Sequence, residues 1–175
     1  MISPEHCHLM ARYNEWMNLR LFALCAELPA AELYADRGAF FKSIYLSLNH
    51  IAYADLAFLS RFTGDPGTVP ERAADLFGSF ANLRAQREAL DGRLLAWTAA
   101  LSASWLAGPL SYVSKIDGKT RTAARWVLLT HMFNHETHHR GQVTTLLSQM
   151  GLDMGSTDIP FMPGFEQNAS DDPVA

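Results

Sequence analysis

Apolar residues recur at helical spacing along four long segments of the chain, and polar stretches containing Gly or Pro separate these segments. The segments cover about residues 4–28, 40–63, 75–103 and 122–150. Ser3-Pro4 is a typical helix start, and Pro29 and Gly151 are typical helix stops. In the third segment, five residues are spaced to share one face: Leu83, Leu90, Leu94, Trp97 and Leu101. Four helices of about 20–30 residues, with almost no strand, predict an all-α fold, a four-helix bundle.

The connections between the predicted helices differ in length and pattern. Residues 29–39 predict a plain connector. The connection between helices three and four is the longest, which predicts a long crossover rather than a simple hairpin of helices. Within it, "LSYVSKIDGKTRT" (residues 110–122) alternates around Asp117-Gly118. That pattern favours a short β-hairpin with a two-residue turn, and a plain crossover loop is the alternative.

The composition is typical of one globular domain. The chain has 175 residues, of which 49% are hydrophobic and 18% are charged. We place this domain at residues 1–165 and a flexible C-terminal tail at residues 166–175. The loop that precedes the tail carries three large apolar residues that we expect to pack on the bundle: Phe161, Met162 and Phe165.

Charge and hydropathy exclude several classes of function. The 14 Lys and Arg residues and 18 Asp and Glu residues give a formal charge of −4, which offers no electrostatic footprint for nucleic acid. No stretch has the roughly 18 uninterrupted apolar residues of a membrane span, and the N-terminus lacks the pattern of a signal peptide. We therefore expect a cytoplasmic protein with reduced thiols. We expect Cys7 and Cys25 to serve as packing residues.

The stretch "NHETHHRGQV" (residues 134–143) concentrates histidines on the fourth predicted helix. At 100° per residue, His135 and His139 face the apolar stripe of that helix, whereas His131 lies at its edge and His138 further out. Two imidazoles four residues apart can share one divalent ion, and neutral core histidines are the alternative. For His131 and His138 we expect surface or supporting roles rather than ligation.

A metal site with an open coordination position usually has three protein ligands, so a third is needed. His50, in the second predicted helix, is the best candidate. Its side of the helix carries small residues that would let another helix approach: Ser43, Ser47, Ala54 and Ala57. A partly buried histidine without a metal is the alternative. His6 and His8 are predicted to lie at the surface, and Asp55 is predicted to be an ordinary helix carboxylate or an outer partner of the site.

His135, Glu136 and His139 also match the H-E-x-x-H pattern of zinc peptidases, in which the Glu polarises a water. The helical wheel places Glu136 within reach of the core. However, such peptidases resemble α/β constructions with a strand edge for the substrate, and no other helix supplies a downstream carboxylate. Gln142 and Thr145 stand where a metzincin would need Gly and His. A metallopeptidase is therefore the weakest of the functions we consider.

The fourth-helix stretch "NHETHHRGQVTTLLSQMG" (residues 134–151) resembles the signature of the DinB-like proteins, a superfamily related to YfiT. The resemblance extends to "ARYNEWMNLRLF" (11–22) and "LSLNHIAYADLAFLSRF" (46–62), and covers the chain to about residue 165. It implies a four-helix bundle with a non-sequential helix order, often a homodimer. It also implies a divalent metal ion, zinc or nickel, held by three histidines that match His50, His135 and His139.

Some DinB-like proteins are thiol-dependent transferases or isomerases that use mycothiol, bacillithiol or glutathione. The resemblance therefore implies a metal-dependent transferase or hydrolase that acts on a small molecule, with a low-molecular-weight thiol as a candidate cofactor. The alternative is a non-catalytic metal-binding stress protein that works through dimer contacts. Neither hypothesis involves nucleic acid or a membrane.

Overall fold

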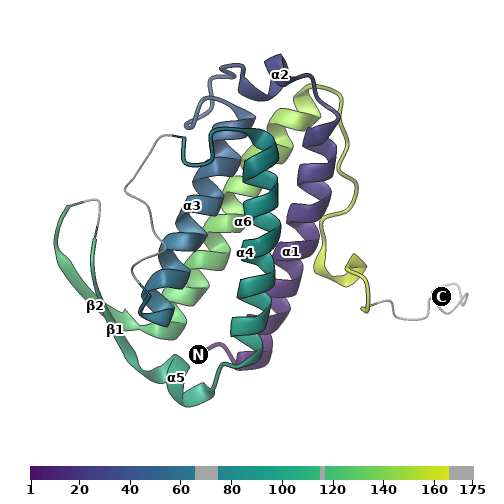
Figure 1. Ribbon diagram of the computed structural model, residues 1–175. Helices are drawn as coiled ribbons and strands as arrows, with labels where there is room; N and C mark the ends of the chain where they lie inside the picture. The colour runs from purple at the N-terminus through teal and green to yellow at the C-terminus, as the bar shows by residue number, and fades with distance from the viewer. Residues whose placement is uncertain (66–74, 115–116, 166–175) are drawn as a thin grey trace, which may run out of the picture.

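Four long helices form the body of the molecule (Figure 1). The computed structural model describes residues 1–65, 75–114 and 117–165. The long helices are α1 (Pro4–Ala26), α3 (Ile44–Thr63), α4 (Phe80–Ala99) and α6 (Arg125–Gln149). They confirm the predicted all-α four-helix bundle.

The helices are not arranged around the bundle in chain order. The helix α1 packs against α4 and α6, and α3 packs against the same two helices. The order around the bundle is therefore α1, α4, α3, α6. Figure 1 shows that α1 and α6 run in one direction while α3 and α4 run in the other. As a result, the antiparallel pair α3 and α6 lies side by side although about 60 residues of sequence separate the two helices.

Serine caps set the starts of three of the four long helices. The hydroxyl of Ser3 accepts a hydrogen bond from the His6 amide, as the sequence predicts. The second predicted helix begins at Ile44 rather than at residue 40, because Ser43 caps it by accepting from the Leu46 amide at 3.1 Å. The third predicted helix likewise begins late, at Phe80, after a cap by Ser79. Residues 40–43 are therefore a loop, a correction that bears on the functional site.

The connections contain more structure than the sequence predicts. The expected plain connector holds a short helix, α2 (Ala30–Tyr34), and a second short helix, α5 (Ala103–Ala107), follows α4. The predicted hairpin is present as β1 (Pro109–Val113) and β2 (Thr120–Ala124), which pair antiparallel. Its last pair is Val113 with Thr120, so the predicted two-residue turn at Asp117-Gly118 is wrong, and six residues connect the strands.

Residues 152–165 lie along α1 and are held there by polar contacts. The hydroxyl of Tyr13 donates to the carbonyl of Thr157 at 2.8 Å, and Arg20 donates to the carbonyl of Ser156 at 2.6 Å. Because both donors belong to α1, these contacts tie the segment to the bundle.

The three apolar residues expected to pack in that segment behave differently. Met162 is 2% exposed against α1, as predicted. Phe161, the last residue of the short 3-10 helix Ile159–Phe161, is 65% exposed, so that prediction is wrong. Phe165 is partly exposed, and its ring packs against the guanidinium of Arg12 at 5.3 Å. The expectation of a flexible tail at residues 166–175 falls outside the described residues.

The core consists of two apolar clusters separated by a polar layer. One cluster surrounds Leu48 and Leu147, and the other surrounds Leu59 and Met132. Cys25 belongs to the first and Cys7 to the second, and both are fully buried, as expected of packing residues. Between the clusters lie buried polar side chains from all four long helices: Asn14, Asn18, Asp55, Arg87, Asp91, Glu136 and Arg140. Among the helices of the described part of the chain, none has the length and apolar character to span a bilayer.

Candidate metal centre

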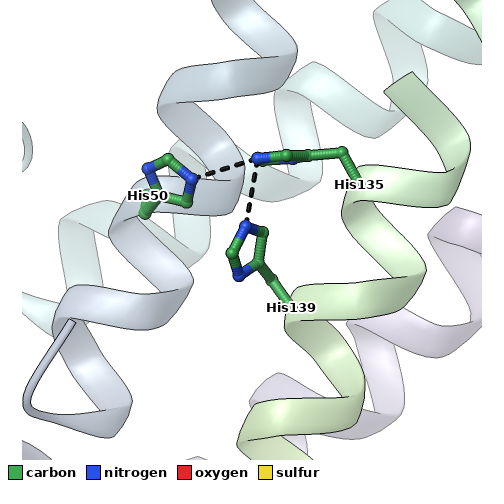
Figure 2. Close-up of side chains that lie close together, drawn as sticks. All are labelled: His50, His135 and His139. Carbon is green, nitrogen blue, oxygen red and sulfur yellow. Dashed lines mark hydrogen bonds between the residues drawn. The ribbon is translucent and has the colours of Figure 1, made fainter. Parts of the chain in front are cut away.

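Three imidazole rings meet in the space between α3 and α6 (Figure 2). His50 comes from α3, and His135 and His139 come from successive turns of α6. The Nε2 atom of His135 lies 3.1 Å from Nε2 of His50 and 3.1 Å from Nε2 of His139. His139 is buried, whereas His50 and His135 are half-buried, so one side of the group faces solvent. The structure thus brings together the three histidines that the sequence singled out.

A neighbouring amide fixes the orientation of one ring. The side-chain oxygen of Gln142 lies 2.8 Å from Nδ1 of His139. That oxygen can only accept, so Nδ1 of His139 carries the proton and its Nε2 presents a lone pair to the group. This places Gln142 directly behind a candidate ligand, a role that the sequence analysis did not assign to it.

Burial keeps the rings of His135 and His139 neutral. Desolvation, together with the neighbouring histidines, lowers the pKa of His135 to about 3. Desolvation also lowers the pKa of His139, although the hydrogen bond with Gln142 acts in the opposite direction. Neutral imidazole is the form that binds metal ions, so both rings are ready to act as ligands near neutral pH.

The arrangement of the three nitrogens fits a divalent ion. Two nitrogens that each lie about 2.1 Å from one ion are separated by about 3.0–3.4 Å, depending on the coordination geometry. The two 3.1 Å separations fall in this range. Hydrogen bonding alone explains the group less well, because a proton on Nε2 of His135 can point towards only one of its two neighbours. Moreover, Nδ1 of His135 is buried without a hydrogen-bond partner among the described residues.

The other histidines lie where the sequence predicted, with one exception. His131 and His138 are exposed, and their rings flank the group at 5.9 Å from His135 and 4.8 Å from His139. His6 is exposed as expected. His8 is half-buried rather than on the surface, because its Nδ1 lies 3.2 Å from the hydroxyl of Thr98 on α4.

Glu136, the glutamate of the H-E-x-x-H pattern, points into the bundle. Its side chain is fully buried in the polar layer, 3.7 Å from the guanidinium of Arg140. Neither of its carboxylate oxygens accepts a hydrogen bond from the described residues. Desolvation, and then the charge of Asp55, raise the pKa of Glu136 well above its ordinary value. A protonated Glu136 can donate to Asp55, and the direction of the pKa favours this neutral acid although Arg140 lies nearby.

The rest of the polar layer is a network of buried ion pairs. Arg87 of α4 donates to Asp55 of α3, and it also donates to Asp91 at 2.6 Å. Asn18 of α1 donates to both oxygens of Asp91 at 3.1 Å. Burial alone would lower the pKa of Arg87, but the charges of Asp91 and Asp55 outweigh it and raise that pKa. Asp55 is therefore a fully buried partner of an arginine, which corrects the prediction of an ordinary helix carboxylate.

The sequence does contain a signal for this layer. Three of the four helices carry two polar residues four positions apart on the inward face, where apolar residues are expected. The pairs are Asn14 and Asn18, Arg87 and Asp91, and Glu136 and Arg140. On α4, Arg87 falls within the predicted apolar face, between Leu83 and Leu90.

The fold and the site together define a class: a four-helix bundle with non-sequential helix order and a three-histidine group between two of its helices. Comparison with known proteins gives the family. The sequence model of the DinB family matches residues 1–170, and the chain belongs to that family.

Two relatives agree with this assignment. The chain is similar to Protein DinB of Bacillus subtilis (strain 168), with 28% identity over 158 residues that cover 83% of this chain and 87% of the relative. Its fold is similar to that of YfiT from Bacillus subtilis, with a TM-score of 0.64 over 87% of this chain and 92% of that one, at 16% identity. At that level of identity, the second likeness shows the fold alone. YfiT is described as a probable metal-dependent hydrolase with an unusual four-helix bundle topology.

Proposed function

We propose that this protein is a metal-dependent enzyme, a hydrolase or a thiol-dependent transferase, that acts on a small molecule. His50, His135 and His139 would hold the divalent ion, for which zinc and nickel are our candidates. The observation that carries the proposal is the convergence of the three Nε2 atoms, with His135 at 3.1 Å from each of the other two. Membership of the DinB family and the description of YfiT as a probable metal-dependent hydrolase support it.

The chemistry that a divalent ion would supply there is to lower the pKa of a water or a thiol, which makes a nucleophile available near neutral pH. The chain's own residues prepare the site for it. Gln142 holds the proton of His139 on Nδ1 and leaves Nε2 free to bind. The protein's thiols take no part, because Cys7 and Cys25 are both fully buried in the core. The nucleophile would therefore come from solvent or from a small thiol.

The peptidase alternative finds no support in the position of its glutamate. A peptidase base must be ionised and must reach a water at the open side of the site. Glu136 instead lies fully buried beside Arg140, with a raised pKa, on the inward face of α6. The same five residues that match the motif therefore lack the arrangement that its chemistry needs.

Elemental analysis of the purified protein, with equilibrium dialysis against zinc and nickel, tests the metal site. We expect about one ion per chain, and we expect the His135→Ala and His139→Ala variants to lose most of it. His138→Ala is the matched control, since it removes an exposed histidine from the same helix and should retain the ion. Equal losses at residues 138 and 139 would contradict the assignment of ligands.

A panel of ester, amide and epoxide substrates, with and without glutathione, bacillithiol or mycothiol, tests catalysis. We expect turnover that requires the bound ion and that disappears in His139→Ala. A protein that retains its ion but turns over none of these substrates would favour the non-catalytic alternative. The homodimer stays a prediction, to be checked by light scattering.

A further inference from the structure

The loop that precedes α3 places an aromatic ring against the three-histidine group. The ring of Phe41 stacks on the imidazole of His50, with 3.9 Å between centroids and 21° between planes. It also meets the ring of His139 edge-on at 5.4 Å. Phe41 thus contacts two of the three candidate ligands, one from each helix of the site.

This loop is held in a defined conformation. The amide of Arg37 donates to the carbonyl of Lys42 at 2.9 Å, and the amide of Lys42 donates back to the carbonyl of Ala39 at 2.7 Å. Lys42 adopts a positive φ of 66°, which is uncommon for a residue other than Gly. The side chain of Arg37 also forms an ion pair with Glu32 of α2. These contacts hold the backbone on both sides of Phe40 and Phe41 in place without a ligand.

Phe40 extends the aromatic surface outward from the site. Its ring meets that of Phe41 edge-on, with 4.8 Å between centroids, and it is 84% exposed. Leaving a phenyl ring in water has a free-energy cost, which binding of an apolar group would recover. The two rings therefore form a continuous apolar surface that runs from the imidazoles of the site to solvent.

We propose that Phe40 and Phe41 form a subsite that binds an aromatic group of the substrate or of the thiol, next to the metal centre. The proposal rests on the proposed function, because it assumes that His50, His135 and His139 hold an ion. It adds a substrate class: molecules in which an aromatic group lies close to the reacting sulfur or oxygen atom. Two neighbouring aromatic rings beside the three-histidine group are suited to select such molecules.

Cobalt-loaded protein allows this to be tested without knowing the reaction, because thiolate binding to Co²⁺ gives an absorption band. The probes are benzyl mercaptan and ethanethiol, two primary thiols that differ by a phenyl in place of a methyl group. We expect Phe40→Ala and Phe41→Leu each to weaken benzyl mercaptan binding by about threefold to tenfold, as expected for the loss of one aromatic contact. Ethanethiol binding and cobalt stoichiometry should stay unchanged. Phe161→Ala, which removes another exposed ring far along the chain, is the matched control.

The outcomes separate this inference from the function on which it rests. If wild-type protein takes up no cobalt, the metal-dependent function fails and the subsite fails with it. If it takes up cobalt but binds neither thiol, the subsite alone is overturned, because a metal-dependent hydrolase that uses water remains possible. If cobalt and both thiols bind but the variants leave the preference for benzyl mercaptan unaltered, the subsite alone is overturned. Equal weakening of both thiols would also overturn it, since Phe41 would then act only by orienting His50. A change of oligomeric state in Phe40→Ala with unchanged thiol binding would assign the exposed ring to a contact between chains instead.

Discussion

Replacing Arg87 with methionine should destabilise the fold more than any exposed arginine replacement. The guanidinium of Arg87 is 2% exposed and neutralises two carboxylates, those of Asp55 and Asp91, which are 0% and 3% exposed. Methionine can fill the space of the arginine stem but supplies no charge and no donor. The variant would therefore leave two buried carboxylates without their cation.

The magnitude follows from what each carboxylate retains. Breaking a buried ion pair by removing one partner costs about 3–5 kcal/mol. Asp91 keeps the two hydrogen bonds from Asn18, both at 3.1 Å. Asp55, whose pKa is already raised by burial, can take up a proton. Both effects favour the lower end of the range, so we expect a loss of about 3 kcal/mol. That is a large part of the roughly 5–15 kcal/mol that stabilises a typical domain.

Arg84→Met is the matched control, because it makes the same change one turn earlier on α4. Arg84 pairs with Glu88 at 3.0 Å, but the two side chains are 40% and 49% exposed. Such a pair contributes only about 0.3–0.5 kcal/mol. Urea unfolding of the metal-free variants at neutral pH, followed by circular dichroism, measures both losses without the contribution of a bound ion. A loss below about 1 kcal/mol for Arg87→Met, or equal losses for the two variants, would refute this account of the polar layer.

Three further predictions use other buried groups. Because burial raises the pKa of Glu136, the folded chain binds a proton there that the unfolded chain releases, so stability should fall as pH rises above the ordinary glutamate range. Urea midpoints across that pH range should show Glu136→Gln removing this decline, and an unchanged slope would contradict it. Gln142→Ala should weaken zinc binding by about 10- to 100-fold in a competition titration, because it removes the side-chain amide that orients the imidazole of His139. His138→Ala should leave zinc binding unchanged. Burial raises the pKa of Cys7 to about 11 and that of Cys25 to about 12, so iodoacetamide should label neither thiol in the native protein and both in urea, as mass spectrometry can count.

The sequence predicts the bundle and its three-histidine group because both depend on helical periodicity. An apolar stripe with a period near 3.6 residues locates each long helix to within a few residues. The same period places His135 and His139 on one side of α6, and small residues beside His50 allow α3 to approach. Each of these inferences needs only the geometry of a single helix and one assumption about packing. The metal ion itself stays a prediction.

The sequence does not predict the loop that carries Phe41. The apolar run from residue 40 onward reads as the start of a helix, and the periodicity gives no reason to stop it. The start is set at Ser43 by its cap to Leu46, and by the positive φ of Lys42. Both features are local, but periodicity alone does not reveal them, since Ser and Lys also occur inside helices. The contact between Phe41 and His50 follows from that loop, so it becomes visible only in the folded chain.

The sequence does not predict the buried charges either, for a different reason. A single charged residue within an apolar stripe, such as Arg87, is usually an interruption that reaches solvent. Its burial becomes reasonable only when other helices supply opposite charges at the same level, as Asp55 does from α3. Such partners are distant in sequence, so no window on one helix reveals them. A pattern that can reveal them is a pair of polar residues four positions apart on the inward faces of several helices.

The position of Glu136 shows why the H-E-x-x-H pattern predicts different chemistry in different folds. Successive residues on a helix point about 100° apart, so His135 and Glu136 point into different surroundings. In this bundle α6 packs with α3 on one side and α1 on the other. The two histidines of the motif face His50 on α3. Arg140, on the inward face of α6, donates a hydrogen bond to Asn14 of α1. Glu136 lies on the same inward face as Arg140, and its side chain is buried in the polar layer. The motif therefore contributes two candidate ligands to the site and one buried acid to the core, and the packing of its helix decides this division.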